Sequence, residues 1–266
     1  MATITDPNDL LTAFERSTLS GPYKEYASAK RNNLFASIQL FRPIWDCCML
    51  ANDIWLRGFR DMDNLSSTTQ MIPLSLYMNA HAKMLVTIEL GFSGCISEAH
   101  SILRDAIESV AHAHRMLINP GLQTVWLQRN DGNAGRDGFK HEFIDAKKDR
   151  LFAGLPVLHR LWRQFSDWGS HTSMNSILMR FQIQETPTHI QYRMNYTGAE
   201  QEDWTKILLV MLDTFAAMEE LFYSDFRSRL TLDHELSALR TSFDQAKEAE
   251  RRRIIAKYNI SAAAHG

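Results

Sequence analysis

The spacing of hydrophobic and polar residues predicts long amphipathic helices along most of the chain. Between Gly91 and Pro120, apolar and small residues recur at three- and four-residue steps: Ile96, Ala99, Leu103, Ala106, Val110, Ala113 and Leu117. A second series at similar spacing is polar and consists of Ser97, Ser101, Arg104, Glu108, His112 and Arg115. Because residues three and four apart lie on the same side of a helix, this stretch is predicted to form a central helix with a buried face and a separate polar stripe.

Hydrophobic periodicity and turn residues predict further helices on both sides of the central one. They cover about 5–20, 23–61, 71–90, 139–152, 155–168, 198–230 and 231–258. Pro43 is expected to kink or split the second of them, because its ring removes a backbone hydrogen bond and crowds the preceding turn. The short link at 92–94 predicts that 71–90 and the central helix pack as an antiparallel hairpin. The glycine-rich segment 121–138 is predicted to be a mobile loop.

One stretch has the alternation of a β-strand instead. The runs ILMRFQIQ and HIQYRMNY are separated by ETPT, a connector of hairpin length, so a β-hairpin is predicted at about 176–196. The predicted fold is therefore all-α, a multi-helix bundle with long antiparallel helices and one small β-hairpin. We expect a helical bundle domain over 1–230 and an amphipathic C-terminal helix over 231–258 that packs on it or on a partner. A disordered tail is expected over 259–266.

Composition and charge narrow the classes of function. The net charge of −2 excludes a dominantly polybasic protein, so any nucleic-acid surface has to be a local patch. Three cysteines without a Cys-x-x-Cys pair predict neither a disulfide framework nor a zinc site. The N-terminus lacks the pattern of a signal peptide, and no apolar run reaches membrane-spanning length. We expect a cytoplasmic protein without a membrane partner.

The polar stripe of the central helix holds the first candidate chemistry. Arg104 and Glu108 are one turn apart and are predicted to form an ion pair, which on an exposed face contributes only about 0.3–0.5 kcal/mol. The pair is either a structural polar seam that sets the register between helices or part of a site. Glu108 and His112 would supply two metal ligands, but no second Glu/His pair completes a di-metal site, and no metal or other cofactor is expected.

Two other segments carry residues with reactive side chains. In WGSHTS, His171 is suited to acid–base chemistry near neutral pH with Ser170 beside it, and the alternative is that both only satisfy helix ends and a buried carbonyl. The basic stretch ERRRIIAK, at 250–257, is either a solvated helix or a partner-binding surface. The chain has no GxxxxGKS, GxGxxG or GxSxG motif, which disfavours nucleotide hydrolysis, dinucleotide chemistry and serine hydrolysis.

The run IELGFSGCISEAHSILRDAIESV, at 88–110, resembles uncharacterised bacterial HEPN-like proteins grouped as a domain of unknown function. In that family an apolar helix ends at a glycine link, and a Glu-Ala pair, a Leu-Arg step and a glutamate four residues after the arginine follow. Here these positions are Glu98-Ala99, Leu103-Arg104 and Glu108. FSDWGSHTS is similar to the downstream segment of the family, with Ser170 and His171.

The resemblance implies a helical bundle that dimerises. It also implies a relation to the metal-independent ribonucleases of prokaryotic defence and toxin systems, in which a histidine follows an arginine by four to six residues. The resemblance and the polar residues together make Arg104, Glu108, His171 and Ser170 the first choice of catalytic residues. Arg136 and His141, which match the spacing, are the second choice.

Two functions stay open at this point. One is an RNA-directed module that acts as an endoribonuclease without a cofactor. The other is a non-catalytic oligomerising protein that binds a protein partner through its C-terminal helix. A homodimer is expected under either function, and the sequence leaves open whether the chain is an enzyme.

Overall fold

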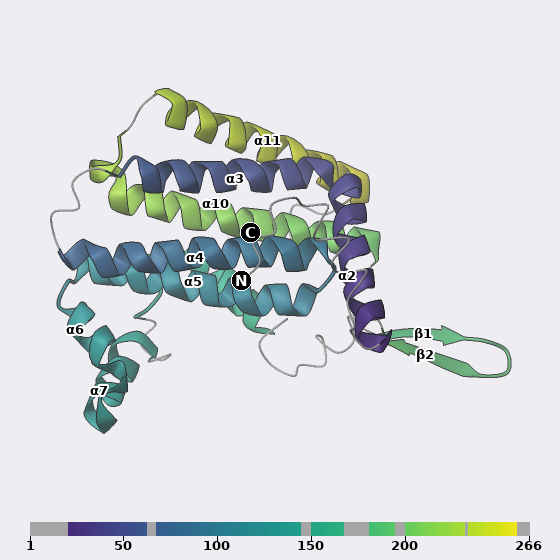
Figure 1. The fold of residues 1–266 in the computed structure, drawn as a ribbon, viewed down its shortest axis with the longest axis horizontal. Coiled ribbons are helices and arrows are strands. Elements are labelled where there is room, and N and C mark those ends of the chain that lie inside the picture. Colours follow the sequence, from purple (N-terminus) through teal and green to yellow (C-terminus); the bar gives the residue numbers. More distant parts are fainter. Residues whose placement is uncertain are drawn as a thin grey trace.

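A computed structural model describes residues 21–62, 68–144, 150–167, 181–194, 200–231 and 234–259, and almost all of this part is helical. Long helices lie side by side along the longest axis of the molecule (Figure 1). They are α3 (Arg42–Arg60), α4 (Thr68–Phe92), α5 (Ile96–Ile118), α10 (Gln201–Phe226) and α11 (His234–Tyr258). The prediction of an all-α helical bundle is therefore confirmed. The helix predicted at 5–20 and, apart from Asn259, the tail predicted at 259–266 lie outside the described residues.

The helix predicted at 23–61 is split at the expected place. α2 (Gly21–Leu40) and α3 meet at an angle of 96°, and Pro43 lies in the first turn of α3. Proline is tolerated there because the first backbone N–H groups of a helix have no intrahelical partner. The break lets α2 cross the end of the bundle while α3 runs along it (Figure 1).

Among the described helices, no single one is long and apolar enough to cross a membrane. The bent pair α2–α3 passes the test of length and composition only when the two helices are taken together.

The predicted hairpin of α4 and α5 forms around a short turn. Gly94 has a φ of +79°, a backbone conformation that strains residues with a side chain, and Cys95 N donates to Leu90 O at 2.8 Å to close the end of α4. α5 then buries the apolar face read from the sequence, namely Ile96, Ala99, Leu103, Ala106, Val110 and Ala113. Leu117 is only partly buried. The polar stripe is partly exposed along its whole length.

The prediction of a loop at 121–138 is wrong. The segment forms α6 (Leu122–Leu127), the 3-10 turn η1 (Gln128–Asn130) and α7 (Gly132–Phe139), and it continues as a π-helix, η2 (Lys140–Ile144). A Cβ atom on Gly135 would lie 2.0 Å from the carbonyl oxygen of Gln128. The glycine therefore permits α7 to pack directly on η1, and its role is close contact instead of flexibility.

The helix predicted at 139–152 is also shorter than expected. Its described part reaches Ile144, residues 145–149 lie outside the described part of the chain, and 151–154 form a turn, so the helix does not extend to 152. Gly154 has a φ of +80° and is followed by Leu155 and Pro156, the first residue of α8 (Pro156–Phe165). Proline disfavours a helical conformation at the residue before it, which explains why α8 begins there as a separate helix.

A β-hairpin and helix α11, both from the C-terminal half of the chain, complete the described fold. Strands β1 (Phe181–Glu185) and β2 (Ile190–Met194) pair antiparallel, with Phe181 opposite Met194, and they project from the bundle (Figure 1). The remainder of the interval predicted for a hairpin, 176–180 and 195–196, lies outside the described residues. After α10 and the 3-10 turn η4 (Arg227–Arg229), α11 lies against α3 and α10 and buries Leu236, Phe243 and Ile254.

Candidate functional site

Arg104 and Glu108 form the predicted ion pair on the polar stripe of α5. Arg104 Nη2 lies 3.0 Å from Glu108 Oε1, and the side chains are 26% and 31% exposed. Trp162, from α8, donates its Nε1–H to the same Glu108 oxygen at 2.8 Å. The guanidinium of Arg104 lies over the indole ring, 5.0 Å from its centroid.

These three contacts tie α5 to α8. An arginine that is paired with a carboxylate and stacked on an indole is held on two sides, so its charge is engaged within the protein. Arg104 Nε is buried and has no hydrogen-bond partner among the described residues. The arrangement favours the structural interpretation of the polar seam. Ser170 and His171, the other two first-choice residues, lie outside the described residues, so the structure does not place them next to Arg104 or Glu108.

His112 packs against aromatic rings. Its imidazole meets the rings of Phe139 and Phe143 edge-on, at centroid distances of 5.8 Å and 5.0 Å. The pKa of His112 is lowered to about 4, chiefly by burial and to a smaller extent by the nearby charges of Arg129, Arg115 and Lys83. The neutral imidazole therefore acts as an aromatic side chain that holds α7 and η2 against α5. No group of three His, Cys, Asp or Glu side chains suitable for a metal ion occurs within the described part of the chain.

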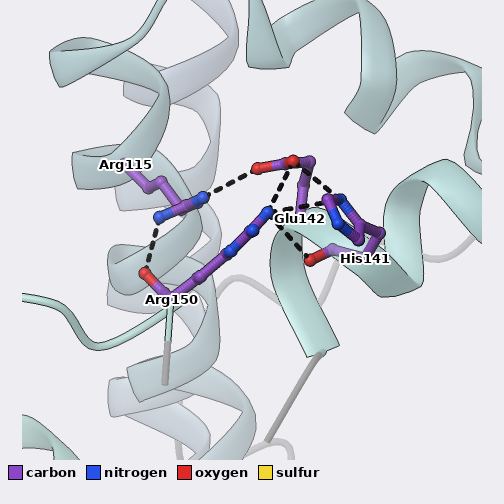
Figure 2. A network of polar contacts seen from close by, with 4 residues as sticks. All are labelled: Arg115, His141, Glu142 and Arg150. Carbon is purple, nitrogen blue, oxygen red and sulfur yellow. Dashed lines mark hydrogen bonds and ion pairs between the residues drawn. The ribbon is translucent and has the colours of Figure 1, made fainter. Parts of the chain in front are cut away.

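A polar network surrounds Glu142 of η2, where α5, η2 and the turn before α8 meet (Figure 2). Arg115 of α5 donates through Nη2 to Glu142 Oε2 at 2.9 Å and through Nη1 to the carbonyl oxygen of Arg150 at 2.7 Å. Arg150 Nη1 in turn donates to Glu142 Oε1 at 2.8 Å. Two arginines thus bind one carboxylate. Burial opposes its charge, but hydrogen bonds from His141 and Arg115 and the charge of Arg150 keep the pKa of Glu142 below its ordinary value.

His141 is the exposed member of this network. Its Nδ1 lies 2.9 Å from Glu142 Oε1, so the imidazole donates Nδ1–H to the carboxylate. Arg150 Nη1 donates to the carbonyl oxygen of His141 at 3.4 Å; it also lies 3.2 Å from Nδ1, which carries a proton in this tautomer and does not accept from it. In this tautomer Nε2 is the ring nitrogen with a lone pair. A carboxylate that fixes the tautomer of an exposed histidine is an arrangement suited to acid–base chemistry.

Arg136 lies on α7, five residues before His141 on the same continuous helical segment, 132–144. Both side chains are exposed. The second-choice pair therefore shares one helical segment that projects from the bundle (Figure 1), with Arg150 beside the histidine. The prediction of a loop at 121–138 did not place Arg136 and His141 on one helical segment, because glycine content alone does not distinguish a flexible loop from closely packed helices.

A buried triad of polar groups was missed in the sequence. Tyr77 Oη donates to Asp225 Oδ2 at 2.6 Å, and His114 Nδ1 lies 2.8 Å from Asp225 Oδ1. The three residues come from α4, α10 and α5, and the tyrosine is fully buried. Burial, together with the nearby charge of Asp225, raises the pKa of Tyr77 well above its ordinary value. Asp225 follows Tyr77 by 148 positions, so no local pattern could have indicated the triad.

A cavity between α8, α10 and α11 was missed as well. Its volume is about 820 Å³, and its lining includes Glu219 of α10 and Arg240 of α11, which form a largely buried ion pair. In the sequence both residues fall on amphipathic helices where charged side chains are expected on the solvent side. Only the burial of Glu219, whose side chain is 6% exposed, distinguishes it from its neighbours.

Comparisons of the chain with protein-family models, with curated proteins and with solved structures find no match.

Proposed function

We propose that the chain is an RNA-directed, HEPN-like helical protein that cleaves RNA without a metal ion, with His141 as the proton-transfer group. The observation that carries the proposal is the His141–Glu142 contact of 2.9 Å, in which a carboxylate clamped by Arg115 and Arg150 orients an exposed imidazole. Two basic residues support the proposal: Arg150 contacts His141, and Arg136 precedes it by five residues on the same helical segment.

The chemistry follows from these groups. His141 Nε2 accepts the proton of a ribose 2′-hydroxyl as its oxygen attacks the adjacent phosphorus. The new P–O2′ bond forms while the P–O5′ bond breaks, and the departing O5′ takes up a proton from the imidazolium or from water. The products are a 2′,3′-cyclic phosphate and a 5′-hydroxyl. Arg136 and Arg150 supply positive charge for the phosphorane that forms in between.

The test uses a single-stranded RNA oligonucleotide in buffer that contains EDTA. Wild-type protein is expected to release fragments with 2′,3′-cyclic phosphate ends, and His141→Ala to lose this activity. His189→Ala is the matched control, because His189 is also exposed but lies at the turn of the hairpin. An oligonucleotide with 2′-deoxyribose throughout is expected to stay intact. Cleavage that survives in His141→Ala, or an absence of cleavage by the wild type, would refute the proposal.

A second candidate function is a non-catalytic, self-associating interaction protein. The observation that favours it is an exposed face of α4 made up of Met71, Ser75, Met78, Ala82 and Leu85. The steps of four and three residues alternate along this face, as in the seam of a coiled coil. Met71 and Leu85 lie seven residues to either side of Met78. A second copy packed antiparallel would place Met78 on Met78 and Met71 opposite Leu85, which satisfies the self-complementarity of a twofold interface.

Light scattering tests this second function. Met78→Glu is expected to convert a dimer into a monomer, because it places two like charges at the twofold axis. Ile118→Glu is the control, since Ile118 is exposed at the end of α5 and lies outside the α4 face. A wild-type protein that is monomeric at micromolar concentration, or a Met78→Glu variant that remains a dimer, would contradict the assignment.

A further inference from the structure

The cavity of about 820 Å³ between α8, α10 and α11 lies outside the His141 network and the α4 face. Its size is that of pockets that hold small organic ligands. Apolar side chains from all three helices contribute to the lining: Val157, Leu161, Ile207, Val210, Ala217 and Phe243. The lining residues of α10 run from Lys206 to Glu220, which at 1.5 Å per residue corresponds to a length of about 20 Å. An elongated apolar ligand fits this shape.

Charged side chains of α8, α10 and α11 contribute to the same cavity. The cations are Arg160, Lys206, Arg240, Lys247 and Arg251, and the carboxylates are Asp213, Glu219, Glu220 and Asp244. Most are paired across the lining: Arg251 donates to Asp213, Lys247 lies 3.8 Å from Asp244, and Arg240 pairs with both Glu219 and Glu220. Lys206 pairs outside the lining, with Glu202 at 2.5 Å. A ligand with a negative head group would therefore have to replace the partner of one of these cations.

The ion pair between Arg240 and Glu219 is the contact in this lining that an anionic ligand would replace. The guanidinium of Arg240 bridges two carboxylates of α10 and lies over the ring of Tyr223, 3.8 Å from the centroid. Glu220 is 68% exposed and keeps its hydration, whereas Glu219 is 6% exposed and depends on Arg240 for its charge. Protonation of Glu219 would leave Arg240 with a single, solvated partner, and an anion that enters the cavity could then bind the guanidinium.

We propose that this cavity is a binding site for an anionic amphiphile of the straight-chain carboxylate class, with the hydrocarbon chain along α8 and α10 and the carboxylate at Arg240 in exchange for Glu219. The apolar lining supplies the affinity, because it removes the hydrocarbon chain of the ligand from water. The guanidinium of Arg240 supplies the selectivity for the sign of the head group.

Binding of such a ligand depends on pH. The pKa of Glu219 is raised to about 7, chiefly by burial; Arg240 on α11 opposes the rise, and the charges of Glu220 on α10 and Asp244 on α11 add to it. Arg160 of α8 lines the same cavity. Glu219 is therefore largely neutral at pH 6.5 and ionised at pH 8.0. If the ligand binds only when Glu219 is neutral, its dissociation constant rises about eightfold between these pH values.

The test is calorimetric titration of the full chain with dodecanoate below its micelle concentration, at pH 6.5 and 8.0. The dodecanoate carboxylate stays ionised over this range, so a change in affinity reports on the protein. We expect saturable one-to-one binding that is about eightfold tighter at pH 6.5. Dodecyltrimethylammonium, which has the same chain and the opposite charge, is expected to bind at least tenfold more weakly. Comparable affinity for the ammonium compound, or no saturable binding of dodecanoate, would overturn the proposal.

Two matched pairs of variants locate the site. Glu219→Gln is expected to bind dodecanoate at pH 8.0 as tightly as the wild type does at pH 6.5, whereas Glu220→Gln is expected to keep the pH dependence. Ala217→Trp fills the cavity and is expected to abolish binding, while Ala249→Trp, on the exposed side of α11, leaves it unchanged. Circular dichroism checks that each variant is folded. Binding unaffected by Ala217→Trp would refute the location, and a pH dependence retained in Glu219→Gln would refute the role of Glu219.

Discussion

The substitution Tyr77→Phe tests the buried triad of Tyr77, Asp225 and His114 with a minimal change. It removes only the hydroxyl group and leaves the ring, which is fully buried and packs against Trp55 and Phe222 at centroid distances of 6.2 Å and 5.3 Å. The hydroxyl donates to Asp225 Oδ2 at 2.6 Å. The phenylalanine ring fits the same space, so the expected loss comes from this hydrogen bond alone.

The magnitude follows from the charge and burial of the acceptor. A hydrogen bond to a charged group contributes about 1.5–3 kcal/mol, and Asp225 is 9% exposed, so water replaces little of what is lost. His114 still donates to the other carboxylate oxygen, which keeps the loss at the lower end of the range. We expect Tyr77→Phe to reduce the free energy of unfolding by about 2 kcal/mol, with a fall in Tm of roughly 4–8 °C for a chain of this length.

Urea denaturation followed by circular dichroism measures the change. Tyr26→Phe is the control, because Tyr26 is exposed and its hydroxyl lies 3.9 Å from Cys95 Sγ; its effect should stay within about 0.5 kcal/mol. The pKa of Tyr77 is raised in the folded protein, so the stability of the wild type should fall as the pH rises above about 10, and the gap to Tyr77→Phe should narrow there. A Tyr77→Phe protein as stable as the wild type would refute the reasoning about the triad.

Three further predictions concern other residues. Trp162→Phe removes the indole N–H from Glu108 and should cost about 1 kcal/mol in urea denaturation; no loss would argue against a brace between α5 and α8. The lowered pKa of His112 means that its contribution to stability is present above pH 6.5 and is lost as the pH falls towards about 4, so His112→Gln should flatten the acid limb of the stability profile. Gly135→Ala places a methyl group against the Gln128 carbonyl oxygen and should destabilise the segment 122–144 by about 1–3 kcal/mol. Proteolysis within 122–144 should then become faster, and an unchanged rate would contradict this prediction.

The candidate sites were predicted only where their members are close in the sequence. Arg104 and Glu108 are one turn apart, and they do form an ion pair, because a helix brings residues four apart together whatever surrounds it. Trp162, their third member, comes from α8 and gives no local signal. Arg136 and His141 were found by their spacing. Glu142, the carboxylate that contacts the histidine, was not singled out, because it is held in place by Arg115 and Arg150, which come from other parts of the fold.

The error in the predicted loop at 121–138 has a physical cause. Glycine at 132, 135 and 138 was taken as a sign of a loop, yet Gly135 allows a close contact between η1 and α7. Patterns in a single sequence indicate which backbone conformations a residue allows in its own segment. They do not report whether a neighbour approaches within the distance that only glycine allows.

Local patterns in the sequence were enough to predict the long helices, the split at Pro43, the turn at Gly94 and the buried face of α5. These features depend on periodicity and on backbone restrictions that act over a few residues. The packing of the helices was needed to show which charged side chains are buried and which helices line the cavity. It also brought Asp225 into contact with Tyr77 and His114. The physical reason is that the energy of a polar group depends on its solvent exposure and on partners more than a hundred positions away, and both are set only when the helices pack.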